Sequence, residues 1–174
     1  MTTHPFETAP DFVEPFEVWR VWRVVKTAGT VALASVVKDA IWPNEAPLVA
    51  ECRTSRSRVL AALRGHPHPA PASRCECGIY GAGLEIASQY LKDSIPTDLA
   101  RVLGRVALWG EIVECERGFR ASHAYPTALY VPTDEGKRAH GRAAEIAAAL
   151  RRYRVPVQLI ANEAATVAAL GHAA

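Results

Sequence analysis

Apolar residues recur at every second position most regularly in the segment from Val102 to Val131, and in its first half they do so on both parities. A turn signal interrupts the alternation at Glu116-Arg117-Gly118, where the glycine can supply a positive φ. Apolar character returns from Phe119 to Ala124, and it continues from Ala128 to Val131 beyond a break at Pro126. A period of two residues is typical of a β-strand. The segment therefore predicts a long antiparallel hairpin or meander that turns at residues 116–118.

A second strand-like stretch runs from Phe16 to Val25, and it is apolar on both parities. Its β-branched and aromatic residues favour a strand that is covered on both faces. Thr27-Ala28-Gly29-Thr30 predicts a turn after this strand. A further strand is expected at the start of the apolar stretch from Val31 to Trp42.

The rest of the chain predicts shorter elements and a tail. Residues 1–15 are proline-rich and predict an extended N-terminal tail, and residues 16–174 predict one domain. The further elements expected are helices from Ser57 to Arg64, Leu84 to Lys92, Asp134 to Tyr153 (capped by Thr133 or Asp134) and Asn162 to Leu170, and short strands from Cys77 to Gly81 and from Val155 to Ile160. The predicted fold class is α+β: a mostly antiparallel, twisted sheet or small open barrel, with helices on one side and a helical C-terminal region.

Composition adds a cellular setting to this picture. Apolar residues make up 49% of the 174 residues and the formal net charge is +2, which does not demand a polyanionic partner. No apolar run reaches the roughly 18 residues of a membrane span, and the N-terminus lacks the order of a secretory signal. We therefore expect a cytoplasmic protein with no membrane partner. Cysteines in that compartment favour metal binding or redox chemistry over structural disulfides.

The cysteines are the main candidates for chemistry. A tandem pair, Cys75-Glu76-Cys77, follows a run rich in proline and histidine. Thiolates in sets of three or four bind zinc tetrahedrally, and they also hold iron–sulfur clusters. The sequence therefore predicts a site that holds a zinc ion or an iron–sulfur cluster. The expected ligands are Cys52, Cys75, Cys77 and Cys115, with His66 and His68 as substitutes.

Other interpretations of the same residues stay open. Cys52 and Cys115 would also suit small buried core positions. Cys75 and Cys77 would form a strained redox dithiol. Cys115 with His123 would be the minimum for a thiol nucleophile, although no third orienting residue is evident.

Basic residues before the tandem cysteines suggest a second kind of function. Arginines that lie close in sequence can contact phosphates, and tryptophans can stack on bases. The arginines concerned are Arg53, Arg56, Arg58, Arg64 and Arg74. A solvated basic helix is the alternative interpretation.

A few short motifs resemble those of a known group. The run Cys75-Glu76-Cys77-Gly78-Ile79-Tyr80 and the later Trp109-Gly110, Gly118-Phe119-Arg120-Ala121 and Ala124-Tyr125-Pro126 are similar to a group of actinobacterial proteins without an established activity. The resemblance covers roughly Trp19 to Val131. It implies a bacterial, intracellular setting and no particular reaction.

Together these observations predict a small intracellular metal-binding domain that acts through a protein partner and is not an enzyme. A nucleic-acid-binding protein that uses the arginines of residues 53–74 is the alternative. A thiol- or metal-dependent enzyme is the third hypothesis.

Overall fold

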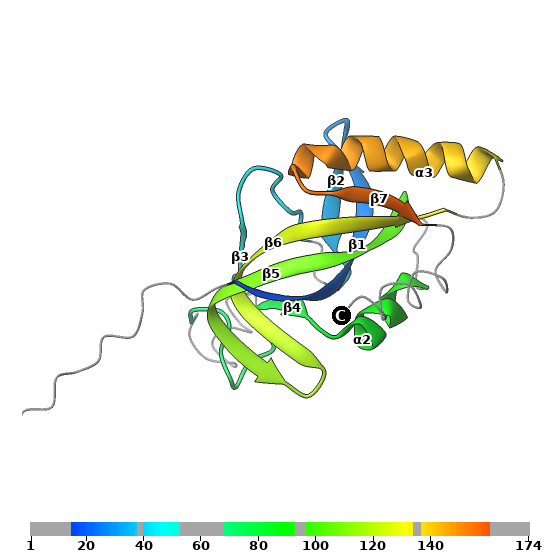
Figure 1. Cartoon of the computed structure of the whole chain (residues 1–174). Coiled ribbons are helices and arrows are strands. Elements are labelled where there is room, and N and C mark those ends of the chain that lie inside the picture. The colour runs from blue at the N-terminus through cyan, green and yellow to red at the C-terminus, as the bar shows by residue number, and fades with distance from the viewer. Residues whose placement is uncertain (1–14, 38–39, 53–67, 93–96, 134–136, 161–174) are drawn as a thin grey trace, which may run out of the picture.

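The computed structural model describes residues 15–37, 40–52, 68–92, 97–133 and 137–160, which form a twisted sheet with two helices (Figure 1). The strands are β1 (Phe16–Thr27), β2 (Thr30–Ser35), β3 (Leu48–Val49), β4 (Ile79–Gly81), β5 (Ala100–Cys115), β6 (Gly118–Pro132) and β7 (Val157–Ile160). The helices are α2 (Leu84–Ser88) and α3 (Lys137–Leu150), each followed by a single 3₁₀ turn, η2 (Gln89–Leu91) and η3 (Arg151–Tyr153). The α+β class expected from the sequence is confirmed.

The long hairpin predicted from the alternation is the largest unit of the sheet. β5 and β6 pair antiparallel, with Cys115 opposite Gly118, so the chain turns at the predicted position. The predicted break at Pro126 is wrong, because β6 runs through this residue. The register instead shifts between Arg105 and Val106, which lies opposite Pro126. A proline has no N–H to donate to the neighbouring strand. A local shift of register lets a long strand contain a proline without breaking.

Strand β6 pairs with more strands than any other described strand of the sheet. The strands β2, β1, β5 and β6 follow one another through antiparallel pairs. The other edge of β6 pairs in succession with β4, with β3 and with β7. β7 is parallel to β6, so the sheet is mixed. It is not closed into a barrel, although a bridge between Trp19 and Ala82 joins β1 to the segment after β4.

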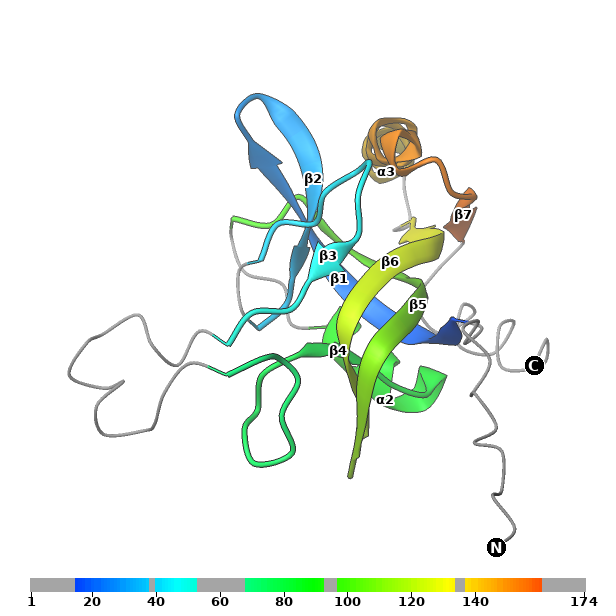
Figure 2. The ribbon, with the colours of Figure 1, turned by 90° about the vertical axis from the view of Figure 1, so that its left-hand side faces the viewer.

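The two helices cover opposite faces of the sheet, as Figure 1 and the rotated view in Figure 2 show. Ile146 and Leu150 of α3 belong to the same buried cluster as Trp22 of β1. Ala87 of α2 packs in a second cluster with Val21, the next residue along β1. Successive strand residues point to opposite faces, so β1 is covered on both sides. The expectation of helices on one side is wrong, whereas the two-sided cover predicted for β1 is confirmed.

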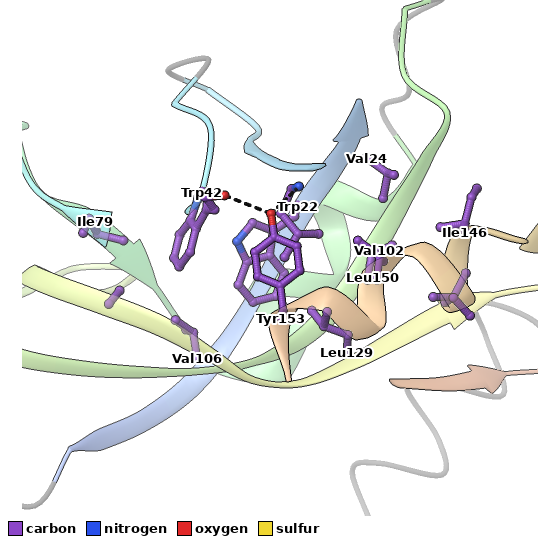
Figure 3. Packing of buried hydrophobic residues seen from close by; sticks show 14 of the residues in the cluster. Trp22, Val24, Trp42, Ile79, Val102, Val106, Leu129, Ile146, Leu150 and Tyr153 are labelled. Atoms are coloured by element: carbon purple, nitrogen blue, oxygen red, sulfur yellow. Dashed lines mark hydrogen bonds between the residues drawn. The ribbon is translucent and has the colours of Figure 1, made fainter. Parts of the chain in front are cut away.

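An aromatic group fastens the helical layer to the sheet. The buried rings of Trp22 and Trp42 meet edge to face with centroids 5.3 Å apart. Tyr153 donates its hydroxyl proton to the carbonyl oxygen of Trp42 at 2.9 Å, the dashed contact in Figure 3. The same hydroxyl oxygen accepts a hydrogen bond from the Leu33 amide at 2.9 Å. The Tyr153 hydroxyl is therefore satisfied both as donor and as acceptor, whereas the buried Trp22 Nε1 has no hydrogen-bond partner among the described residues.

The C-terminal part follows the expected order of a helix and then a strand as far as residue 160, the last one that the structure describes. α3 and η3 fill the predicted helix up to Tyr153, and β7 then returns to the sheet. The Thr133 hydroxyl, proposed as a helix cap, donates to the Ile160 carbonyl oxygen at 2.8 Å instead. The predicted helices of residues 57–64 and 162–170 and the tail up to residue 14 lie outside the described residues. Within the described ranges, no helix has the length and apolar character needed to cross a membrane.

Candidate metal centre

Two segments distant in sequence reach the same part of β6. The β3 segment pairs with it at Val49 and His123, and the Ala50 amide then donates to the Ser122 carbonyl oxygen at 2.8 Å. The β4 segment begins beside it, with Ile79 opposite Ala121. Cys52 follows the first segment and Cys77 precedes the second. Their shared strand therefore brings the two cysteines to one place.

Three cysteines and one histidine form a cluster there. The ligand atoms of Cys52, His68, Cys75 and Cys77 all lie within 4.8 Å of one another. The Cys52 Sγ atom is 3.8 Å from the Cys75 Sγ and 3.4 Å from the His68 Nε2. The Cys77 Sγ lies 4.0 Å from the other ring nitrogen of His68. This group can bind a metal ion.

Two of the separations have the lengths expected around one tetrahedral ion. Zinc binds sulfur at about 2.3 Å and imidazole nitrogen at about 2.0–2.1 Å, so tetrahedral ligands lie about 3.8 Å apart for two sulfurs and about 3.5 Å apart for sulfur and nitrogen. The two contacts of Cys52 agree with both values. An iron–sulfur cluster places several iron and sulfide atoms between its thiolates and spreads the ligands further apart.

His68 is prepared for ligation through one nitrogen. Its Nδ1 lies 2.8 Å from the carbonyl oxygen of Pro69. A carbonyl oxygen only accepts hydrogen bonds, so Nδ1 carries a proton, and in the neutral imidazole Nε2 then keeps its lone pair for a metal. A backbone carbonyl on the second nitrogen is the usual support of a metal-binding histidine. This hydrogen bond also raises the pKa of His68.

A buried arginine of β6 supports the loop that carries the tandem cysteines. Arg120 donates from Nη1 to the carbonyl oxygens of Ala72 at 3.3 Å and Cys77 at 2.8 Å, and to that of Cys75. The Cys75 amide in turn donates to the Ala72 carbonyl oxygen at 3.1 Å. The guanidinium therefore holds the backbone that carries Cys75 and Cys77 against β6.

Cys77, the second cysteine of the tandem pair, lies in a tightly packed environment. Cys77 is buried, and its burial raises the pKa of its thiol. Gly78 follows with a φ of +119°, and a Cβ there would stand 3.0 Å from the Cβ atoms of both Arg120 and Pro71. Only glycine suits this backbone and this space. Cys52, Cys75 and His68 are partly exposed, so an ion can reach the site from solvent.

Cys115, the fourth ligand predicted from the sequence, lies outside the cluster. It ends β5, and its thiol donates to the Gly118 carbonyl oxygen at 3.2 Å across the hairpin turn. β5 and β4 pair with opposite edges of β6, so they are about 10 Å apart, twice the strand spacing. His68, a substitute ligand in the sequence analysis, completes the group instead. His66 lies outside the described residues.

Within the described ranges, the other candidate residues form no second centre. His123 pairs with Trp109, and its ring stacks on that indole with centroids 5.9 Å apart. Trp109 and Cys115 are six positions apart on β5, a distance of about 20 Å along a strand, which rules out the alternative of a thiol–imidazole pair. Arg74 is exposed, while Arg53, Arg56, Arg58 and Arg64 lie outside the described residues. Trp22 and Trp42 are buried in the core and offer no stacking surface.

No family model matches the chain, and no curated protein or solved structure is significantly similar to it. Inferences about function therefore depend on the site itself.

Proposed function

We propose that the protein is a zinc-binding domain in which Cys52, His68, Cys75 and Cys77 hold one structural ion, and that it acts by binding a partner. The convergence of four ligand atoms within 4.8 Å carries this proposal. Three thiolates and one imidazole form a set that is typical of structural zinc sites. The resemblance to actinobacterial proteins adds a bacterial, cytoplasmic setting to the proposal.

The ligand count favours a structural role over a catalytic one. Catalytic zinc keeps one position for water or substrate, whereas four protein ligands close the coordination sphere. The ion would connect the segment after β3 to the loop before β4. These strands are short, with two and three residues, so their pairing with β6 gives them limited support. Energy of metal binding at such a site contributes to folding.

Metal content tests the proposal directly. The protein, purified without chelator, should contain about one zinc per chain by elemental analysis and should be colourless. Replacement of zinc by cobalt(II) should give the intense visible bands of a tetrahedral thiolate site. A brown protein with iron and acid-labile sulfide would contradict the zinc assignment, and a protein without any metal would contradict the whole proposal.

A partner protein is the second part of the proposal. The closed site leaves binding rather than metal catalysis as the role of the domain. Cross-linking of the wild type and of Cys77→Ser in the native cell should show a partner that depends on the intact site. Identical cross-linked species for both proteins would contradict a role of the metal site in that interaction.

A further inference from the structure

A cavity of about 480 Å³ lies beside the metal centre, surrounded by β1, β2, β3, β4 and α2. Its volume falls within the range of small-molecule sites. Apolar side chains from β1, β3, β4, α2 and the segment after β2 line it, among them Val36, Ile41, Leu48, Ile79, Ile86 and Ala87. The interior is therefore suited to an apolar body.

The mouth of the cavity is also apolar. The described residues include seven large hydrophobic side chains that are exposed, and five of them line this cavity. They are Val37, Ile41, Val49, Tyr80 and Tyr90. Exposed apolar groups gathered in one place mark a binding surface, whereas scattered ones need no explanation.

Two cations of the described residues line this apolar space: Arg117, which is exposed and donates to the Gln89 side-chain oxygen at 2.8 Å, and Arg20. The Arg20 guanidinium lies over the Trp42 ring, 5.1 Å from its centroid, and it donates to the Ser35 hydroxyl at 3.0 Å and to the Tyr80 carbonyl oxygen. These bonds use two of its five N–H groups, and its Nε is buried with no hydrogen-bond partner among the described residues. No carboxylate of the described chain lies within ion-pair distance of it. Desolvation lowers the pKa of Arg20 to about 10.

Arg20 is half-buried, and a cation partly withdrawn from water without an anion is costly, so an anionic ligand would offset that cost. Glu51 and Glu76 also line the cavity, on the side of the metal centre. Their charges disfavour a ligand with several negative charges, such as a nucleotide. A single carboxylate matches one guanidinium in charge and in its paired geometry.

We propose that this cavity binds a small organic carboxylate with an apolar body, such as a medium-chain fatty acid, and that Arg20 binds its carboxylate. The apolar chain would fill the space between β2 and α2. This proposal stands on the cavity and on Arg20, and it does not require the metal ion.

Competition binding tests this proposal on the intact protein. An anilinonaphthalene sulfonate, which has an apolar body and one negative charge, should become fluorescent in the cavity. Decanoate should displace it at a concentration about tenfold lower than decanol, because the alcohol lacks the charge. Equal displacement by the two compounds, or no saturable probe binding, would overturn the proposal.

Substitutions test whether Arg20 binds the carboxylate. Arg20→Met should weaken decanoate about tenfold and leave decanol within about twofold, whereas Arg142→Met, an exposed arginine of α3, should change neither. If Arg20→Met does not fold by circular dichroism, Val37→Asp decides the matter. Val37 is 77% exposed, so its substitution should not disturb folding, and a negative charge at the mouth should weaken decanoate about threefold. An unchanged decanoate affinity in Val37→Asp, or in a folded Arg20→Met, would contradict the proposal.

Discussion

Arg120 donates a hydrogen bond to the carbonyl oxygen of Cys77 at 2.8 Å, and this contact joins the central strand β6 to the candidate metal ligands. Arg120→Met should lower zinc affinity about 10–100-fold, the usual effect of removing a group that supports metal ligands. Zinc titration against a chromophoric chelator measures this change. Arg74→Met is the matched control, because it removes the same charge from the neighbourhood of Cys75 without the buried position on β6. An equal loss of zinc affinity in both variants would show that the positive charge alone is responsible, and it would contradict a supporting role of the Arg120 hydrogen bonds.

The two kinds of cysteine should respond differently to serine. Cys77→Ser should lose the bound zinc and lower the melting temperature by about 5–10 °C, corresponding to about 2–3 kcal/mol. Cys115→Ser should keep one zinc per chain, since its thiol lies outside the cluster and donates to the Gly118 carbonyl oxygen across the turn. A chelator should destabilise the wild type and Cys115→Ser but not Cys77→Ser. Superimposed melting curves with and without chelator in the wild type would contradict a structural ion.

A buried ion pair should be important for stability. Asp98 lies 2.7 Å from the Arg23 Nε and 3.1 Å from the Arg101 Nε, and its side chain is 1% exposed. Asp98→Asn should lower the free energy of unfolding by about 3–5 kcal/mol, because two buried cations lose their counter-charge. Glu17→Gln, which breaks the partly exposed pair with Arg105, should cost less than about 1 kcal/mol. Urea denaturation compares the two, and similar losses would contradict this difference.

Tyr153 should make stability fall in alkaline solution. Burial raises its pKa above the usual value. The unfolded chain therefore releases this proton first, and the free energy of unfolding should begin to fall above about pH 10. Tyr153→Phe should reduce that fall and cost about 1–3 kcal/mol at neutral pH, where Leu33 and Trp42 lose their partner. An unchanged slope of unfolding free energy against pH in the variant would contradict this account.

Local pattern was enough to predict the hairpin, because its alternation and its turn lie within one continuous segment. The two-sided cover of β1 was also visible in its sequence. The face of the sheet that each helix covers could not be predicted from the sequence. α2 packs near Val21 and α3 near Trp22, and both of these residues are far from the helices in the chain. Pattern alone also could not show that β6 continues through Pro126, since the compensating shift of register occurs on its pairing with β5.

The candidate site shows the same division. Cys52, Cys75 and Cys77 could be predicted as ligands because cysteine is a common metal ligand. His68 could be predicted as a substitute ligand because it precedes the tandem cysteines in a proline-rich run. The choice between His68 and Cys115 depends on which edge of β6 each segment joins. Strand pairing between distant segments determines which of the two residues joins the cluster, and the spacing of residues along the chain does not predict that pairing.

The position of β6 in the chain has a consequence during protein synthesis. Cys52, Cys75 and Cys77 all leave the ribosome before Gly118, the first residue of the strand to which their segments pair. The nascent chain thus presents three thiols before their structural support exists. Oxidation or binding of a wrong metal competes with correct assembly during that interval, so the yield of zinc-loaded protein should depend on the redox state and zinc supply of the cell while translation is under way.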